Sequence, residues 1–117
     1  MQGAVKEEIG EIVQAVRERL LHSDVADEIL KIVLFGSCAR GQDRPDSDID
    51  LLIVLRQDRW SVVDRIYELV TDLILEYGRE ISLKVFSLGE FQRLVERETP
   101  FIQGVRREGQ IVYEHAL

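Results

Sequence analysis

The chain has 117 residues, of which 45% are hydrophobic and 32% are charged. This composition is typical of a folded, water-soluble domain and excludes an intrinsically disordered chain. The single cysteine, Cys38, excludes an internal disulfide, and no cluster of cysteine and histidine has the spacing of a structural zinc site. No apolar run is long enough to span a bilayer and the N-terminus lacks the apolar core of a signal peptide, so we expect a cytoplasmic protein.

The net charge is -7, which argues against direct binding of long nucleic acid. Such binding depends on basic residues that displace counterions from phosphates. The charge is compatible with a basic protein partner, and equally with an acidic surface that simply keeps the protein soluble. The chain has no internal repeat and no flexible linker, so a single domain over residues 1–117 is predicted.

Hydrophobic spacing predicts the first half of the fold. Residues 1–20 form an amphipathic helix that should cover a sheet, and residues 29–35 form a short buried strand. Residues 36–41 are a turn of small residues that can lead into a helix, and a polar loop over residues 42–47 follows. Residues 48–55 form a second strand, which is close enough in sequence to be a neighbour of the first.

The second half continues the alternation of helices and strands. A long helix over residues 61–77 is predicted from its period, with a capping box of Ser61 and Asp64 at its start and Gly78 at its end. The later elements are a strand at residues 81–86, a helix capped by Ser87 with Glu90, a helix from Thr99-Pro100 to Gly109, and a short strand at residues 111–113. The fold class is therefore α/β, with helices packed on a small mixed sheet.

A glycine-serine turn and two closely spaced aspartates carry the chemistry. Where a strand ends at Gly36 and Ser37 and turns into a helix, backbone amides are left unpaired, and a glycine lets a phosphate approach them. Asp48 and Asp50 are two residues apart on a predicted strand, so both carboxylates leave the same face. Two such carboxylates repel each other unless a cation joins them, and oxygen ligands suit Mg²⁺ or Mn²⁺, which also bridge phosphate oxygens.

The same residues depart from two other binding motifs. Gly36 and Gly41 have the spacing of a Walker A loop, but Gln42 and Asp43 follow where lysine and a hydroxyl residue are required. The aspartates copy the opening of an EF-hand, but Leu51 occupies the glycine position of that loop. The alternative that remains is a solvated acidic loop before a strand, and the upstream glycine-serine turn is what favours a site.

The sequence resembles the minimal nucleotidyltransferase (MNT) group of the DNA polymerase beta-like superfamily in two segments, GSCARG at residues 36–41 and DSDIDLL at residues 46–52. The hallmark of that group is Gly-Ser, a spacer, and Asp-hydrophobic-Asp, and the ten residues 38–47 form the spacer here. Residues 99–102 and 108–109 are similar to the C-terminal end of the group, so the resemblance covers most of the chain. It implies the polymerase beta-like nucleotidyltransferase fold.

The resemblance also implies a reaction, the transfer of a nucleoside monophosphate, with AMP expected, from ATP or another nucleoside triphosphate to a hydroxyl group. Gly36 and Ser37 would hold the β and γ phosphates, while Asp48 and Asp50 would bind two divalent ions, Mg²⁺ or Mn²⁺. The hydroxyl would attack the α-phosphorus and pyrophosphate would leave. Arg40 is expected to contact phosphate or to brace the carboxylates, and a structural role in the turn is the alternative.

The family normally adds a third carboxylate from a later strand, and Glu80 is the candidate here. If the second and third strands are joined by a crossover helix and run parallel, their first residues share one edge, which would place Glu80 near Asp48. The middle of that strand is another place for the acidic residue of the family, but this sequence has Ser82 and Lys84 there. The alternative is a solvated glutamate, which would leave a weak metal site and a binding or regulatory protein.

Finally, the resemblance implies a partner protein. Larger members of the superfamily use further domains to grip the base and the acceptor, and MNT proteins are commonly paired with HEPN-domain proteins, as antitoxin and ribonuclease toxin. They can transfer adenylyl groups to a tyrosine of the toxin. Two functions are therefore open: an adenylyltransferase that modifies its partner, and a non-catalytic antitoxin that acts by occlusion. Transfer to a small molecule such as an aminoglycoside is less favoured, and the sequence leaves a homo-oligomer open.

Overall fold

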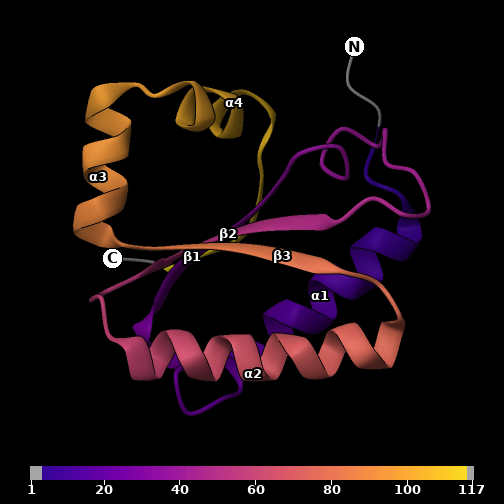
Figure 1. The fold of residues 1–117 in the computed structure, drawn as a ribbon, viewed down its shortest axis with the longest axis horizontal. Helices are drawn as coiled ribbons and strands as arrows, with labels where there is room; N and C mark the ends of the chain where they lie inside the picture. The colour runs from indigo at the N-terminus through magenta and orange to yellow at the C-terminus, as the bar shows by residue number, and fades with distance from the viewer. Residues whose placement is uncertain (1–3, 116–117) are drawn as a thin grey trace.

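The computed structural model describes residues 4–115 and contains a four-stranded sheet with helices on both faces (Figure 1). In chain order the elements are α1 (Glu7–Leu21), a short 3-10 helix (Ala26–Glu28), β1 (Ile29–Phe35), β2 (Ile49–Leu55), α2 (Trp60–Tyr77), β3 (Ile81–Ser87), α3 (Leu88–Arg97), α4 (Pro100–Glu108) and β4 (Gln110–Glu114). None of the helices in this part of the chain is long and apolar enough to cross a membrane. The mixed sheet confirms the predicted α/β class.

The strand order is β3-β2-β1-β4. β1 runs antiparallel to both β2 and β4, whereas β2 and β3 are parallel and are joined through α2. A parallel pair needs such a crossover, because its strands start at the same edge of the sheet. The register pairs Phe35 with Asp50 and Ile49 with Ile81. The starts of β2 and β3 therefore lie side by side, next to the end of β1.

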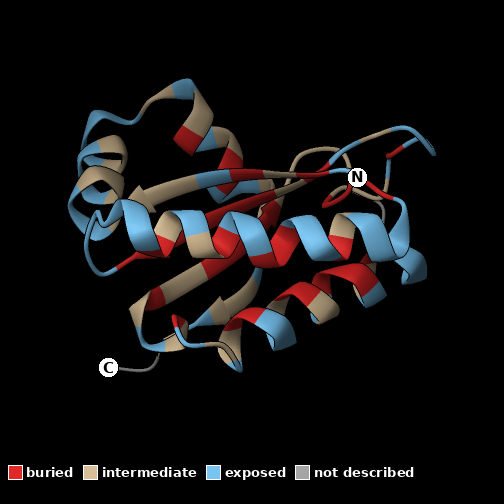
Figure 2. Ribbon diagram, turned by 60° about the horizontal axis from the view of Figure 1, so that its bottom comes forward, coloured by how far each residue is buried: buried red, intermediate tan, exposed pale blue. Residues whose placement is uncertain are grey.

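The two faces of the sheet bury different helices. Ile49, Leu51 and Ile53 share a core with α1 and α2, and the buried stripes of these two helices face the sheet in Figure 2. Leu52 and Val54 lie in a second cluster that includes side chains of α3 and α4. Because side chains alternate along a strand, a residue in phase with Leu52 and Val54 faces α3 and α4. Asp50 is such a residue.

The first helix begins later than its hydrophobic pattern predicted. α1 starts at Glu7, and Lys6 precedes it with an extended backbone. The Lys6 ammonium donates a hydrogen bond to the Asp43 carbonyl at 2.7 Å, which ties this residue to the loop between β1 and β2 instead of to a helical turn. The part of the prediction that falls on residues 1–3 lies outside the described residues.

The predicted capping box of Ser61 and Asp64 is wrong. α2 begins at Trp60, and the residue before it, Arg59, caps it without a side-chain hydrogen bond. The amides of residues 62 and 63 donate to the Arg59 carbonyl, so the first turn closes earlier and Ser61 lies inside the helix. The other start signals are confirmed: Ser87 and Glu90 form a capping box on α3, and the Thr99 side chain caps α4.

Candidate active site

The segment after β1 is a tight turn and not the start of a helix, so the predicted lead into a helix is wrong. The amides of residues 39, 40, 41 and 42 donate back to carbonyls of residues 36–38, which closes the turn on itself. Gly36 and Gly41 adopt left-handed φ angles of 76° and 69°. Within residues 4–115 the amides of Ser37 and Cys38 have no acceptor, and because Cys38 is fully buried it is the N–H of the half-buried Ser37 that remains available to an anion.

Gly36 lies directly against the carboxylate of Asp50. A Cβ atom at residue 36 would stand 2.5 Å from Oδ2 of Asp50 and 3.3 Å from its Cγ, closer than real Cβ contacts come. The left-handed φ and this close approach both require glycine. The turn that offers a free amide and the strand that carries the carboxylates are therefore in contact.

The two aspartates of the predicted metal site differ in environment. β2 begins at Ile49, so Asp48 immediately precedes the strand and is exposed, whereas Asp50 is half-buried. Burial, and secondly the negative charge of Asp48, raise the pKa of Asp50, while the positive charge of Lys84 acts in the opposite direction. The pair therefore holds a second negative charge at a cost, which a bound cation would relieve.

β3 supplies the neighbours of this pair. Its start runs parallel to β2, and the amide of Ile49 donates to the Glu80 carbonyl at 2.9 Å. The Glu80 side chain is exposed, and no group of three acidic, histidine or cysteine side chains within residues 4–115 is arranged to hold a metal ion. The register instead places Ser82 beside Asp50, with Lys84 following on the same face.

Arg40 is held by the other end of the chain. Its Nη1 donates to Oε2 of Glu108 at 2.6 Å, and its Nε donates to Oε1 of Gln42 at 3.1 Å. Glu108 is the last residue of α4, so this ion pair fastens the turn to the helix that covers the site face of the sheet. The predicted phosphate-contacting residue is thus placed at the turn, with its guanidinium engaged by a carboxylate.

Sequence reasoning did not single out two buried charged residues, Asp43 and Arg79. They lie in the polar loop and immediately before β3, and they form an ion pair with Nη2 of Arg79 at 3.3 Å from Oδ2 of Asp43. Neither the loop composition nor the spacing of 36 residues between them gives a signal for this pairing. Glu108 was missed for the same reason, because it lies 68 residues from Arg40.

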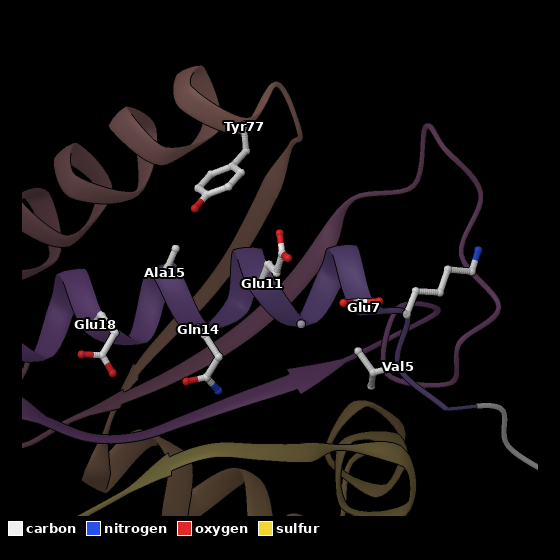
Figure 3. Close-up of a pocket in the computed structure, with 9 residues that line it drawn as sticks. Val5, Glu7, Glu11, Gln14, Ala15, Glu18 and Tyr77 are labelled. Atoms are coloured by element: carbon white, nitrogen blue, oxygen red, sulfur yellow. The ribbon is translucent and has the colours of Figure 1, made fainter.

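A groove of about 730 Å³ lies elsewhere, along α1 and the end of α2 (Figure 3). Glu11, Gln14 and Ala15 of α1 line it, and Tyr77 points toward them from α2. The helices α1 and α2 cover the face of the sheet opposite to the one that Asp50 faces. The sheet therefore lies between this groove and Asp50, although Lys6, which also lines the groove, bonds to Asp43 in the loop before Asp48.

Comparison with known proteins identifies the family. The family described as "Polymerase beta, Nucleotidyltransferase" matches residues 18–116. In Methanocaldococcus jannaschii, "Putative protein adenylyltransferase MJ0604" is 37% identical over 102 residues, which make up 86% of this chain and 96% of that protein. The similarly named MJ1305 of the same organism is 30% identical over 90 residues, 75% of this chain and 60% of that protein.

Solved structures share the fold. A chain in the crystal structure of a toxin-antitoxin with AMP-PNP has a TM-score of 0.52 at 20% identity, covering 94% of this chain and 75% of that one. A chain in a mutant of the toxin-antitoxin MntA-HpeT has a TM-score of 0.51 at 18% identity, covering 92% of this chain and 73% of that one. The family match spans most of the sequence, and it agrees with the contact between the glycine turn and the paired aspartates. The chain belongs to the polymerase beta nucleotidyltransferase family, as its resemblance to the MNT group predicted.

Proposed function

We propose that the protein transfers a nucleoside monophosphate, AMP in the first instance, from a nucleoside triphosphate to a hydroxyl group of a partner protein, with Mg²⁺ or Mn²⁺ as cofactor. The observation that carries this proposal is the contact between Gly36 and the Asp50 carboxylate. It brings a turn with an unpaired amide close to a pair of carboxylates, an arrangement that would suit a triphosphate with its metal ions. The relative MJ0604, named as a protein adenylyltransferase, supports the choice of AMP and of a protein acceptor.

The donor set fits a hard divalent cation. Asp48 and Asp50 offer carboxylate oxygens, and the charge of Asp48 together with burial makes the ionised form of Asp50 costly without one. Mg²⁺ is usually bound by one or two carboxylates plus substrate phosphates and water, so two protein ligands suffice. When bound, the metal would lower the pKa of the attacking hydroxyl and neutralise charge on the leaving pyrophosphate. Glu80 as a third ligand stays a prediction.

The residues of the turn would hold the phosphates. The free amide of the half-buried Ser37 is a donor of the kind that binds phosphate in backbone nests, and the Ser37 hydroxyl adds a further donor. We assign Arg40 a structural role, in which it holds the turn against α4, because its guanidinium is already paired with Glu108. A direct contact of Arg40 with phosphate would require that ion pair to open. The turn therefore positions the triphosphate, and Asp48 and Asp50 position the reacting end.

We further propose that the acceptor lies on a HEPN-domain partner, in a toxin–antitoxin pair. This rests on the resemblance to the MNT group and is supported by the shared fold with chains of toxin-antitoxin crystal structures. The net charge of -7 is compatible with a basic partner. The second candidate function is a non-catalytic antitoxin that acts by occlusion. It is favoured by one observation: among the described residues no third acidic side chain joins the aspartate pair, and Lys84 lies nearby instead.

Label transfer separates the two functions. The purified protein is incubated with ATP, GTP, CTP or UTP labelled at the α-phosphate, with Mg²⁺ or Mn²⁺, in the presence and absence of the protein encoded beside it. We expect metal-dependent label on the partner, and its loss in a variant with Asp48→Asn and Asp50→Asn.

The matched control combines Asp64→Asn with Asp72→Asn, which changes the charge equally at two exposed positions of α2 and should keep full transfer. Tight complex formation without any transfer by the unmodified protein would contradict the enzymatic function and favour occlusion.

A further inference from the structure

We propose that Arg79 is a positioning residue, which fixes the loop of residues 43–47 that leads into Asp48 and so sets the geometry of the metal-binding pair. The inference rests on the proposed function, because the position of Asp48 matters to the reaction only if its carboxylate binds the metal. Arg79 touches neither aspartate of the pair in the structure. Its effect would pass through the loop that ends at Asp48.

The Arg79 side chain is buried, with 10% of its surface exposed; its Nε and Nη2 bond to that loop, while Nη1 lies 3.9 Å from Oε1 of Glu8 in α1. Nε donates to the Ser47 carbonyl at 2.9 Å, and Nη2 donates to the Arg44 carbonyl at 3.0 Å. Nη2 also lies 3.3 Å from Oδ2 of Asp43. One planar guanidinium thus holds three acceptors spread over residues 43–47.

Hydrogen bonds hold three backbone groups around Asp48, and the Arg79 side chain makes the first of these bonds. The carbonyl of Ser47 accepts from Arg79. The amide of Ile49 donates to the carbonyl of Glu80, the residue after Arg79, at 2.9 Å. Between them, the Asp48 carbonyl accepts from Sγ of the buried Cys38 at 3.4 Å. Residues 79 and 80 therefore hold both neighbours of Asp48, so that the start of β3 determines where the start of β2 lies.

A second charged contact locks the far end of the loop. Asp43 is buried, with 3% of its side chain exposed, and Lys6 approaches it from the start of α1. The Lys6 ammonium lies 2.7 Å from the Asp43 carbonyl oxygen and 3.6 Å from Oδ2. A buried carboxylate is costly unless it is paired, and Arg79 and Lys6 supply the cations. Within the described residues Oδ1 of Asp43 has no partner, so the pairing depends on these two groups.

Lysine cannot replace Arg79 in this network. Arg79 binds its acceptors through two separate nitrogens held in a rigid plane, whereas the three donors of a lysine radiate from one nitrogen on a flexible stem and do not match that geometry. Arg79→Lys therefore keeps the charge near Asp43 and loses the bonds to the Ser47 and Arg44 carbonyls. The substitution isolates positioning from charge.

The test measures Mn²⁺ binding by electron paramagnetic resonance, hydrogen exchange of the Ile49 amide, and transfer to the partner as a function of metal concentration. Residues that orient metal ligands typically contribute about 10- to 100-fold to metal affinity. We expect Arg79→Lys to weaken Mn²⁺ binding by about that factor, to speed exchange at Ile49, and to raise the metal concentration for half-maximal transfer while saturating metal restores most of the maximal rate.

The matched control is Arg65→Lys, at an arginine of α2 that pairs with Asp24 and Glu68 away from the loop, and it should behave as the unmodified protein. A folded Arg79→Lys with unchanged Mn²⁺ affinity and unchanged exchange at Ile49 would overturn the inference. If Arg79→Lys does not fold, Asp43→Asn replaces it, with the same directions expected and the same overturning result.

The binding and exchange measurements keep this inference separate from the proposed function. An unmodified protein that binds Mn²⁺ but transfers nothing would refute the proposed transfer, while a loss of binding in Arg79→Lys would still support the positioning role. An unmodified protein that binds no Mn²⁺ would overturn the inference, because the aspartates would then hold no metal for Arg79 to position.

Discussion

At the scale of single residues, Gly36 is the position where a substitution should be most informative. Gly36→Ala would place a Cβ 2.5 Å from Oδ2 of Asp50 and would strain a φ of 76°. We expect a loss of stability of about 1–2 kcal/mol from the left-handed backbone, and a loss of transfer of roughly 100-fold because the carboxylate must move. Thermal unfolding and initial rates of label transfer measure the two effects.

Gly78→Ala is the matched control for Gly36→Ala. Gly78 has a similar φ of 67° at the end of α2, but a Cβ there would meet no atom within 4 Å. It should share the loss of stability and keep the transfer activity. Equal activity of the two variants would show that the contact with Asp50 is not part of the site.

The raised pKa of Asp50 predicts how stability depends on pH. Burial and the charge of Asp48 raise it in the folded state, so ionising Asp50 costs stability. Below the pKa of Asp50 in the unfolded state the residue is protonated in both states, so it causes no loss of stability. The loss grows as the pH rises toward the pKa of Asp50 in the folded state, and above that pH it stays constant. Near neutral pH, with a chelator present to remove divalent metal ions, Asp50→Asn should therefore be more stable than the unmodified protein. The difference in stability should shrink toward acidic pH.

Urea unfolding at a series of pH values measures this difference. Added Mg²⁺ should stabilise the unmodified protein and leave Asp50→Asn nearly unchanged, because a ligand stabilises only the form that binds it. If Asp50→Asn is less stable than the unmodified protein near neutral pH with chelator present, ionisation of Asp50 does not destabilise the fold and the account is wrong.

At the scale of elements, α4 should stabilise the turn through Arg40 and Glu108. Their side chains are 31% and 22% exposed, and the ion pair is short. A double-mutant cycle with Arg40→Gln, Glu108→Gln and both together should give a coupling of about 1 kcal/mol in the free energy of unfolding. If Arg40 holds the turn against α4, both single variants should lower transfer alike. A rise in KM for ATP confined to Arg40→Gln would show instead that Arg40 contacts phosphate.

The elements themselves were largely predictable from periodicity. The apolar runs at β1 and β2 and the helical period of α2 predicted these elements. The parallel pairing of β2 and β3 is the condition for placing Glu80 near Asp48, and the register has that pairing. The errors lie at element starts and at the turn, because these depend on single hydrogen bonds. The Arg59 carbonyl closes the first turn of α2 before Ser61, and residues 39–42 bond back within their own turn instead of continuing as a helix.

The site was predictable where its residues are close in sequence. The glycine turn and the paired aspartates lie within one segment, and a short antiparallel return brings Phe35 opposite Asp50, so that the neighbouring Gly36 meets the carboxylate. The pairs of Arg79 with Asp43 and of Arg40 with Glu108 were not predictable, since they join segments far apart and their residues could equally have been solvated. Sequence pattern therefore predicted that the glycine turn and the aspartates would lie together, and missed the ion pairs that hold the segments around them.

At the scale of the whole molecule, α3 and α4 lie on one face of the sheet (Figure 1). Asp50 faces that side near the edge where β2 and β3 begin, and Asp48 lies just before β2. Aromatic contacts of Phe101 with Phe35 and Phe86 anchor α4 on that face. The groove along α1 and the end of α2 lies on the other side of the sheet. Asp48 is exposed, so in the proposed transfer an acceptor hydroxyl on a second protein would reach it from outside.

The most direct measurement compares ATP labelled at the α-phosphate with ATP labelled at the γ-phosphate, each incubated with the protein, its partner and Mg²⁺. Nucleotidyl transfer predicts that the α label becomes covalently attached to the partner while the γ label leaves in pyrophosphate. No covalent α label on a partner that nevertheless binds tightly, or γ label on the partner, would contradict nucleotidyl transfer as the function of this protein.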